Sequence, residues 1–345
     1  MPFLRVLVVG GTRFIGLHTI PLLVGAGCEV AVFHRGGTEP EGLPHVRHIH
    51  GDRTDLLSFT EQFERFGPDV VLDMVPISRA DAVDTVIAFN QVAERIVAVS
   101  SQDVYLAYDV VRGRHPGPPI DQPMGEDAPL REVLYPYREL FPADHRMHDY
   151  DKIPIEQTYL AEPDLPATIL RLPAVYGPDD YQHRPFPYLK RMVDGRRSII
   201  LDERGVHWRW SRTYVDNAAS AIALAVTNPD AAGQIYNVGD PHTLGEKEWI
   251  EAIGTAHRWR GEVVILPPDD IPDHLRDEEL DFAQSLVVDT GRIREELGYQ
   301  EKVRFEEAMA LTVQWELANM PDALPPHRLD YAAEDAALPG LTLGI

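Results

Sequence analysis

Short apolar runs alternate with helical segments through the first hundred residues of the chain. The runs are rich in Val, Ile, Leu and Phe without a polar face, as is typical of strands buried on both sides. We predict strands over 3–9, 29–33, 69–75 and 95–100, and helices over 18–24, 57–66 and 82–94. This repeated order of strand, helix and strand predicts an α/β fold with a parallel, doubly wound sheet and right-handed crossovers.

A glycine-rich turn joins the first strand to the first helix. The stretch VVGGTRFIG, residues 8–16, places two glycines after the strand and one at the start of the helix. Backbone N–H groups of such a turn face a pyrophosphate at the N-terminus of the helix. We therefore expect a dinucleotide there, held by Gly10, Gly11, Thr12, Arg13, Phe14, Ile15 and Gly16.

Composition excludes several kinds of function. The single cysteine, Cys28, excludes an internal disulfide and a thiolate metal cluster. A formal charge of −23 repels phosphodiester backbones, which disfavours nucleic acid as a partner. The sequence has no signal pattern and no apolar run of about 18 residues, so we expect a cytoplasmic protein without membrane contact.

After Gly177 the alternation becomes irregular, although 215–227 and 247–256 have helical patterns. A chain of 345 residues can form two small domains or one larger unit with an attached lobe. We predict a dinucleotide-binding domain over 1–177, to which 212–238 returns, and a smaller C-terminal substrate lobe built by 178–211 and 239–320. The tail, 321–345, has little periodicity, which leaves an extended arm, a partner contact and disorder as alternatives.

Several separated motifs resemble those of the extended short-chain dehydrogenase/reductases, the superfamily of NAD-dependent sugar epimerases and dehydratases. GGTRFIG resembles its cofactor loop, HGDRTD its adenine-contacting turn, VSSQDVY the strand end with the catalytic serine, and LRLPAVYGP the segment beside the nicotinamide. RTYVDNAASAI, GQIYNVGD and VVDTGRIREELGY resemble later parts, so the resemblance covers about residues 3–317. It implies a Rossmann-type fold and a cofactor site that also includes Asp52, Arg53 and Pro173.

The resemblance implies an NAD(P)-dependent enzyme of the oxidoreductase, epimerase or dehydratase type, acting on a hydroxyl or carbonyl carbon of a sugar-like or small molecule. A nucleotide sugar is one candidate, although Trp210 stands where enzymes of this type that use nucleotide sugars usually carry an arginine, with Arg209 and Arg212 beside it. Two other functions stay open. The chain could bind a cofactor without catalysis, or it could bind RNA, because GGTRFIG and VFHRGG resemble the branch of chloroplast stem-loop RNA-binding proteins. A homodimer is a further possibility.

The charges around the expected ribose pocket favour NADP over NAD. Arg13 lies three residues after Gly10, where the resemblance places an arginine against the adenosine 2′-phosphate in NADPH-dependent reductases. At the end of the second strand, where NAD enzymes carry an acid for the ribose hydroxyls, the sequence has His34 and Arg35. A guanidinium attracts the 2′-phosphate that a carboxylate would repel, so we expect NADP.

The catalytic residues depart from the superfamily's pattern, in which a tyrosine precedes a lysine by four residues on one helix and a serine lies beside them. Ser101 and Lys152 match, with Lys152 also expected at the nicotinamide ribose, but His148 stands four residues before the lysine. The tyrosine is Tyr150, which an ideal helix would turn about 200° away from Lys152. Three alternatives stay open: Pro154 delays the helix so that Tyr150 swings into the site, His148 replaces the tyrosine, or the pair is lost.

The segment 106–151 is longer than the superfamily's usual connection and carries seven prolines. Such a composition predicts a loop of restricted conformation. Because it lies beside the expected site, we predict that it shapes or covers the substrate pocket.

Histidines gather in two places. His45, His48 and His50 alternate near a strand, and His145 and His148 are three residues apart. Neither spacing matches a recognised metal motif. We therefore predict histidines of an edge strand and of a loop, and no metal site.

Overall fold

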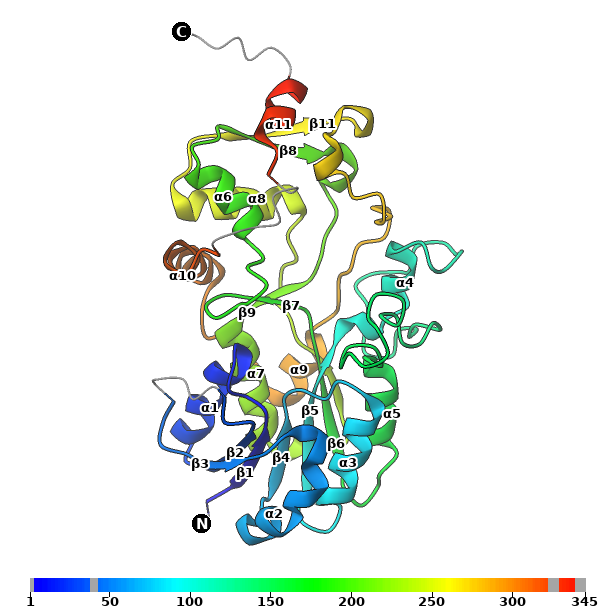
Figure 1. Cartoon of the computed structure of the whole chain (residues 1–345), viewed down its shortest axis with the longest axis vertical. Coiled ribbons are helices and arrows are strands. Elements are labelled where there is room, and N and C mark those ends of the chain that lie inside the picture. Colours follow the sequence, from blue (N-terminus) through cyan, green and yellow to red (C-terminus); the bar gives the residue numbers. More distant parts are fainter. Residues whose placement is uncertain (1–2, 38–42, 322–328, 339–345) are drawn as a thin grey trace.

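A seven-stranded sheet forms the centre of the N-terminal part in the computed structural model, which describes residues 3–37, 43–321 and 329–338 (Figure 1). Neighbouring strands are all parallel, in the order β10-β6-β5-β4-β1-β2-β3. They are β1 (Arg5–Val9), β2 (Glu29–His34), β3 (Arg47–His50), β4 (Val70–Asp73), β5 (Arg95–Ser101), β6 (Ala167–Leu172) and β10 (Ile235–Asn237). The order reverses between β1 and β4, where the carboxyl ends of such sheets bind ligands. The predicted doubly wound parallel sheet is confirmed.

Helices cover both faces of this sheet. On one face α1 (Ile15–Gly25) and α7 (Val215–Thr227) pack together over strand residues such as Val6 and Val8. The other face, with Leu7 and Val9, is covered by the 3-10 helix Arg53–Phe59, α2 (Thr60–Phe66), α3 (Arg79–Phe89) and α5 (Lys152–Leu160). Successive residues of one strand are thus buried on opposite faces, which explains the continuous apolar runs in the sequence.

Element ends differ from the sequence expectations where side chains cap the backbone. The helix expected over 82–94 is α3, which begins earlier because Ser78 and Asp81 form a capping box. The helix expected over 57–66 is the 3-10 helix followed by α2. Arg47–His50 forms β3, the edge strand on which we expected His48 and His50.

A smaller lobe lies beyond the carboxyl ends of the strands (Figure 1). Its elements are the parallel pair β8 (Ser198–Asp202) and β11 (Glu262–Leu266), with α6 (Phe186–Val193), α8 (Glu246–His257) and α10 (Phe305–Ala318). The parallel pair β7 (Ala174–Tyr176) and β9 (Arg212–Tyr214) lies between the lobe and the large sheet. α9 (Gly291–Leu297) contacts β10, and α4 (Ala107–Val111) begins the long insertion 106–151. One hydrophobic core runs through both parts, since it includes Leu189 and Trp249 of the lobe together with Val6.

The described part of the tail is helical. α11 (Tyr331–Ala337) packs on the lobe through Glu334, whose buried carboxylate pairs with the Arg191 guanidinium at 2.6 Å. Residues 322–328 and 339–345, which we expected to be an arm, a partner contact or disordered, lie outside the described residues. Within the described ranges, no helix combines the length and the apolar character that a bilayer crossing requires.

Candidate active site

The glycine-rich turn after β1 has the shape that phosphate binding needs. Gly10 and Gly11 have φ angles of +87° and +84°, which residues with a side chain rarely adopt. A Cβ atom on Gly16 would lie 2.3 Å from the backbone of Gly11, so α1 approaches the turn only because position 16 is glycine. The turn leaves room for a pyrophosphate at the N-terminus of α1, and its residues fit a dinucleotide.

Arg13 stands in this turn without backbone strain of its own. The unusual angles fall on Phe14 (φ 42°, ψ −121°), whose ring is buried and meets the Tyr181 ring edge-on at 6.1 Å between centroids. Thr12 and Ile15 are half-buried, whereas Arg13 is exposed and has no ion-pair partner among the described residues. The turn therefore presents one free guanidinium to solvent.

The carboxyl end of β2 carries a buried His34 and an exposed Arg35, with no acidic residue at either position. Asp52, expected in the adenine-contacting turn, accepts hydrogen bonds from the backbone N–H of Thr54 at 3.0 Å and from its hydroxyl at 2.9 Å. These bonds lower the pKa of Asp52, and the positive charges of Arg35 and Arg146 lower it further. Arg146 belongs to the insertion, so the insertion reaches the neighbourhood of the expected adenosine.

Arg53 points into the protein and contacts buried groups there. Its guanidinium binds both carboxylate oxygens of Asp73 at 2.6 and 2.5 Å and the Thr85 hydroxyl at 3.0 Å. Asp73 is fully buried at the end of β4 and also accepts the Tyr159 hydroxyl. A buried carboxylate requires such a partner. Arg53 therefore forms a structural ion pair, and its contact with a cofactor stays a prediction.

Tyr150 lies just before the helix that carries Lys152. α5 begins at Lys152 because Asp151 is its N-cap and accepts the N–H of Ile153 at 3.0 Å. Pro154 falls in the first turn, where its missing N–H leaves no bond unmade. The spacing of an ideal helix consequently does not apply to Tyr150, and the Lys152 ammonium lies 5.6 Å from the centroid of its ring. The structure thus brings the two side chains together, as the first of the three alternatives supposes.

Ser101 and Asp103 meet Tyr150 at the carboxyl end of β5. The Tyr150 hydroxyl donates a hydrogen bond to Oδ2 of Asp103 at 3.2 Å and also interacts with the Ser101 side chain. The Ser101 hydroxyl accepts the backbone N–H of Asp103 at 3.2 Å. Oδ1 of Asp103 is buried and has no hydrogen-bond partner among the described residues. A carboxylate oxygen in this state is costly, and a hydroxyl of a bound molecule would satisfy it.

Burial shifts the pKa values of this cluster. It lowers the pKa of Lys152 to about 8, against the opposing charges of Asp103 and Asp73. It raises the pKa of Tyr150 well above its ordinary value, and the charge of Asp103 raises it further. It also raises the pKa of Asp103, which Arg131 and Lys152 oppose. Tyr150 therefore keeps its proton at neutral pH, and Asp103 is the adjacent group that can accept one.

The two remaining predicted residues differ in their placement. Nδ1 of His148 donates a hydrogen bond to the carbonyl oxygen of Phe141 at 2.8 Å, within the insertion. In the described part of the chain, His148 makes no hydrogen bond to the Ser101–Tyr150 cluster. Pro173, in contrast, directly follows Leu172, which is paired with Ser101 across β6 and β5. Pro173 thus lies at the same sheet edge as the serine.

Aromatic residues from the insertion and the lobe surround the cluster. The Tyr137 ring packs against Tyr150 at 5.3 Å between centroids, and Nε1 of Trp210 donates to the Tyr108 hydroxyl at 3.0 Å. Burial raises the pKa of both Tyr108 and Tyr137, and the charge of Asp103 raises it further. We call Tyr108, Tyr137 and Trp210 the aromatic wall. No periodic pattern in the sequence predicts this wall or the role of Asp103.

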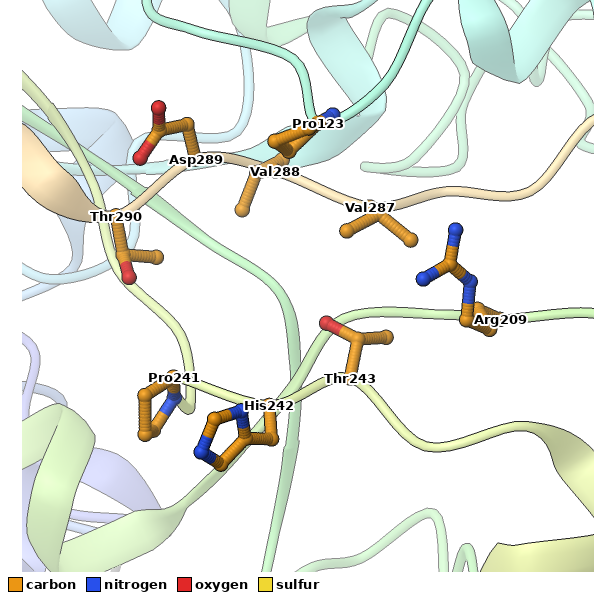
Figure 2. A pocket seen from close by; sticks show the side chains of 9 residues that line it. All are labelled: Pro123, Arg209, Pro241, His242, Thr243, Val287, Val288, Asp289 and Thr290. Carbon is orange, nitrogen blue, oxygen red and sulfur yellow. The ribbon is translucent and has the colours of Figure 1, made fainter.

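A separate cavity of about 350 Å³ opens between segments 241–243 and 287–290 (Figure 2). Arg209, Thr243 and Asp289 line it, and none of the residues of the Ser101–Tyr150 cluster does. Arg209 precedes Trp210, so neighbouring residues of one segment serve this cavity and the aromatic wall. Arg212 is held elsewhere, by an ion pair with Glu246 at 2.6 Å.

Curated relatives of the chain include named enzymes. A 2′-dehydrokanamycin reductase of Streptomyces kanamyceticus is 27% identical over 287 residues, which cover 80% of this chain and 73% of the relative. A probable dTDP-glucose 4,6-dehydratase of Sinorhizobium fredii is 24% identical over 355 residues, or 92% of this chain and 93% of the relative. The chloroplast stem-loop binding protein of 41 kDa b of Arabidopsis thaliana is 25% identical over 247 residues, or 68% and 58% of the two chains.

Solved structures share the fold over nearly the whole chain. An epimerase from Methanothermobacter thermautotrophicus superposes with a TM-score of 0.67 at 18% identity, covering 92% of this chain and 93% of the other. The UDP-glucose 4-epimerase of Thermotoga maritima gives a TM-score of 0.65 at 18% identity, covering 91% and 99%. Residues 6–239 match the model of the NAD dependent epimerase/dehydratase family, which confirms the resemblance seen in the motifs. The chain belongs to the NAD dependent epimerase/dehydratase family.

Proposed function

We propose that this enzyme is an NADP-dependent oxidoreductase acting on a carbon–oxygen bond of a sugar-like molecule, with Tyr150 exchanging a proton with the substrate oxygen. The observation that carries the proposal is the position of the Tyr150 hydroxyl, which meets Asp103 and Ser101 while its ring lies beside Lys152. These groups converge at the carboxyl end of β5, near the switch point where ligands of such sheets bind.

The turn after β1 and the end of β2 would hold the cofactor, which supplies or accepts a hydride at its nicotinamide ring when bound. Arg13 and Arg35 are exposed, and no described residue gives either one a hydrogen bond or an ion pair. A hydrogen bond between charged groups contributes about 1.5–3 kcal/mol. Since no carboxylate at the end of β2 repels a 2′-phosphate, this arrangement supports NADP within a family described as NAD dependent.

Lys152 is fixed by two backbone oxygens. Its ammonium donates to the carbonyl of Pro76 at 2.6 Å and to that of Val99 at 3.1 Å. An ammonium has three donors, so one stays available for a ribose hydroxyl. Its positive charge also favours the ionised form of the nearby Tyr150, in opposition to burial.

Proton transfer needs a group that takes a proton from Tyr150 and returns it. Asp103 accepts the hydrogen bond of Tyr150. The pKa of Asp103 is raised toward neutral pH, which suits a group that takes up and returns a proton. During reduction Tyr150 donates its proton to the carbonyl oxygen, while Ser101 holds that oxygen by its hydroxyl. During oxidation Tyr150 takes the proton of the substrate hydroxyl and passes its own to Asp103.

A polyhydroxylated ring fits the surroundings of these groups. The aromatic wall offers flat apolar faces on which the C–H faces of a sugar can pack. Oδ1 of Asp103, which has no hydrogen-bond partner among the described residues, would accept a hydroxyl such as a sugar provides. Trp210 occupies the wall where an arginine for a diphosphate would be expected, which favours sugars or aminosugars without a nucleotide over nucleotide sugars.

Two measurements test the proposal. Mass spectrometry of small molecules released from the purified protein should recover NADP or NADPH. NADPH oxidation should then be followed with a panel of ketosugars, keto-aminosugars and nucleotide-linked ketosugars. Recovery of NAD alone would contradict the cofactor assignment, and turnover restricted to nucleotide-linked substrates would contradict the substrate class. Absence of turnover with every carbonyl substrate would favour a protein that binds cofactor without catalysis.

RNA binding remains the second candidate because a relative is named a stem-loop binding protein. Against it stands the formal charge of −23, which cannot neutralise several phosphates over a broad surface. Weak, nonspecific RNA binding at physiological salt is the expected result of a mobility-shift assay. Submicromolar, sequence-selective binding would place RNA first.

A further inference from the structure

Three histidines converge at the end of the sheet opposite β10. β2 and β3 are parallel, and their register pairs His34 with His50. His48 lies two residues before His50 on β3, so all three side chains share one face of the sheet. The topology thus joins His34 to His48 and His50, which their spacing along the chain groups with His45 instead.

Their ring nitrogens are close enough to share one ion. Nε2 of His34 lies 2.8 Å from Nδ1 of His48, and one nitrogen from each of the three residues lies within 4.8 Å of the others. The centroid of the His34 ring lies 5.0 Å from that of the His48 ring and 4.9 Å from that of the His50 ring. Nitrogens bound to a tetrahedral zinc ion at about 2.0–2.1 Å are about 3.3–3.4 Å apart. Side-chain rotations that change these separations by at most about 1.4 Å, the difference between 4.8 and 3.4 Å, would bring the three nitrogens to that spacing.

We propose that His34, His48 and His50 form a site for a divalent transition metal ion such as Zn²⁺, Co²⁺ or Ni²⁺. The ligand set among the described residues consists of imidazoles alone, which suits these ions and not Mg²⁺ or Ca²⁺, whose ligands are oxygens. His34 is buried and gives the site a rigid base, whereas His48 and His50 are exposed and give an ion access from solvent.

One nitrogen of His34 is left to face the other histidines. The backbone N–H of Gly36 donates to Nδ1 of His34 at 3.2 Å, so Nε2 is the His34 nitrogen that shares a proton with Nδ1 of His48 or binds an ion. A metal ion replaces such a proton when imidazoles become ligands. Bound there, it would join the edge strand β3 to β2 and hold the start of the loop that carries Arg35. β2 and β3 are the third and fourth strands from β5, so the ion would not touch Tyr150 or Ser101.

Metal binding can be measured on the full chain, freed of any affinity tag and of metal by a chelator, without cofactor or turnover. Titration with Co²⁺ should give the visible absorption of a four- or five-coordinate ion, saturating at one equivalent, and Zn²⁺ should displace it. The variants His48→Gln and His50→Gln change exposed side chains, and circular dichroism verifies their folding. Each should lose more than about tenfold in affinity, because even residues that only support metal ligands cost about 10–100-fold.

His45→Gln is the matched control, since His45 is exposed, lies just before β3 and stands outside the cluster. It should bind Co²⁺ as the wild type does, and Mg²⁺ should compete with Co²⁺ in neither protein. The proposal is overturned if the wild type does not bind Co²⁺ or Zn²⁺ at micromolar concentration. It is equally overturned if His48→Gln and His50→Gln bind normally, or if His45→Gln loses as much affinity as they do. These outcomes are independent of the reaction proposed at Tyr150.

Discussion

Replacing Tyr150 with phenylalanine removes one hydroxyl from the candidate site and leaves the ring. The lost contacts are the 3.2 Å hydrogen bond to Asp103 and the interaction with Ser101, whereas the packing of the ring on Tyr137 at 5.3 Å is kept. A hydrogen bond to a charged group is worth about 1.5–3 kcal/mol. Its loss should therefore raise the pKa of Asp103 further, since this hydrogen bond lowers it.

The expected kinetic effect of Tyr150→Phe is a fall in kcat of about 10²- to 10⁴-fold, the usual contribution of a general acid or base. NADPH affinity should be unchanged, because the residues assigned to the cofactor phosphates lie at the turn after β1 and the end of β2. Stopped-flow reduction with the substrate found in the panel measures the first quantity, and calorimetry measures the second. Tyr137→Phe, which removes a hydroxyl from the neighbouring ring, serves as the control and should keep its activity.

Three results would refute this reasoning. Tyr150→Phe could retain more than about a tenth of kcat, which would leave the hydroxyl less than about 1.4 kcal/mol of transition-state stabilisation. Tyr137→Phe could lose as much activity as Tyr150→Phe, which would make the effect one of packing. NADPH affinity could fall in proportion to kcat, which would place Tyr150 at the cofactor and not at the reacting oxygen.

Further predictions concern the cofactor, an ion pair and a lysine. Arg13→Ala should weaken NADPH binding about tenfold, which is the low end for an exposed contact between charged groups, and should leave NADH binding unchanged. Calorimetry measures both affinities, and equal losses for the two cofactors would contradict the prediction. Arg53→Ala should destabilise folding by about 3–5 kcal/mol in urea titration, because it leaves the buried Asp73 without its cation, whereas the exposed Arg65→Ala should cost less than about 1 kcal/mol. Because burial lowers the pKa of Lys152 from 10.5 to about 8 in the folded protein, the unfolded chain binds this proton more tightly than the folded protein does. The free energy of unfolding of the wild type, measured relative to that of Lys152→Met, should therefore rise with pH between about 8 and 10.5. A difference that does not change with pH would refute this prediction.

Patterns within one element were enough to predict the fold. Apolar runs, helical segments and one glycine turn lie within short windows, so the parallel sheet and the family could be predicted before the structure was known. Short elements were harder, since β3 spans only Arg47–His50 and contains a single apolar residue, Ile49. Arg53 shows a related limit. Its motif suggested a cofactor contact, but its partner Asp73 is 20 residues away and is recognised only once β4 brings it alongside.

The position of Tyr150 depends on a chain of contacts that no local pattern reveals. Pro154 indicates a late helix start, but Asp151 sets it, and Asp151 is itself held by the buried Arg131 guanidinium at 3.0 Å and by the backbone N–H of Tyr135 at 2.7 Å. Both partners belong to the insertion. The same Arg131 donates to the backbone oxygen of Asp103, so one arginine holds the two segments whose side chains meet at the Tyr150 hydroxyl. The insertion therefore does more than border the site, because it determines the place from which a tyrosine two residues before the lysine can reach the serine.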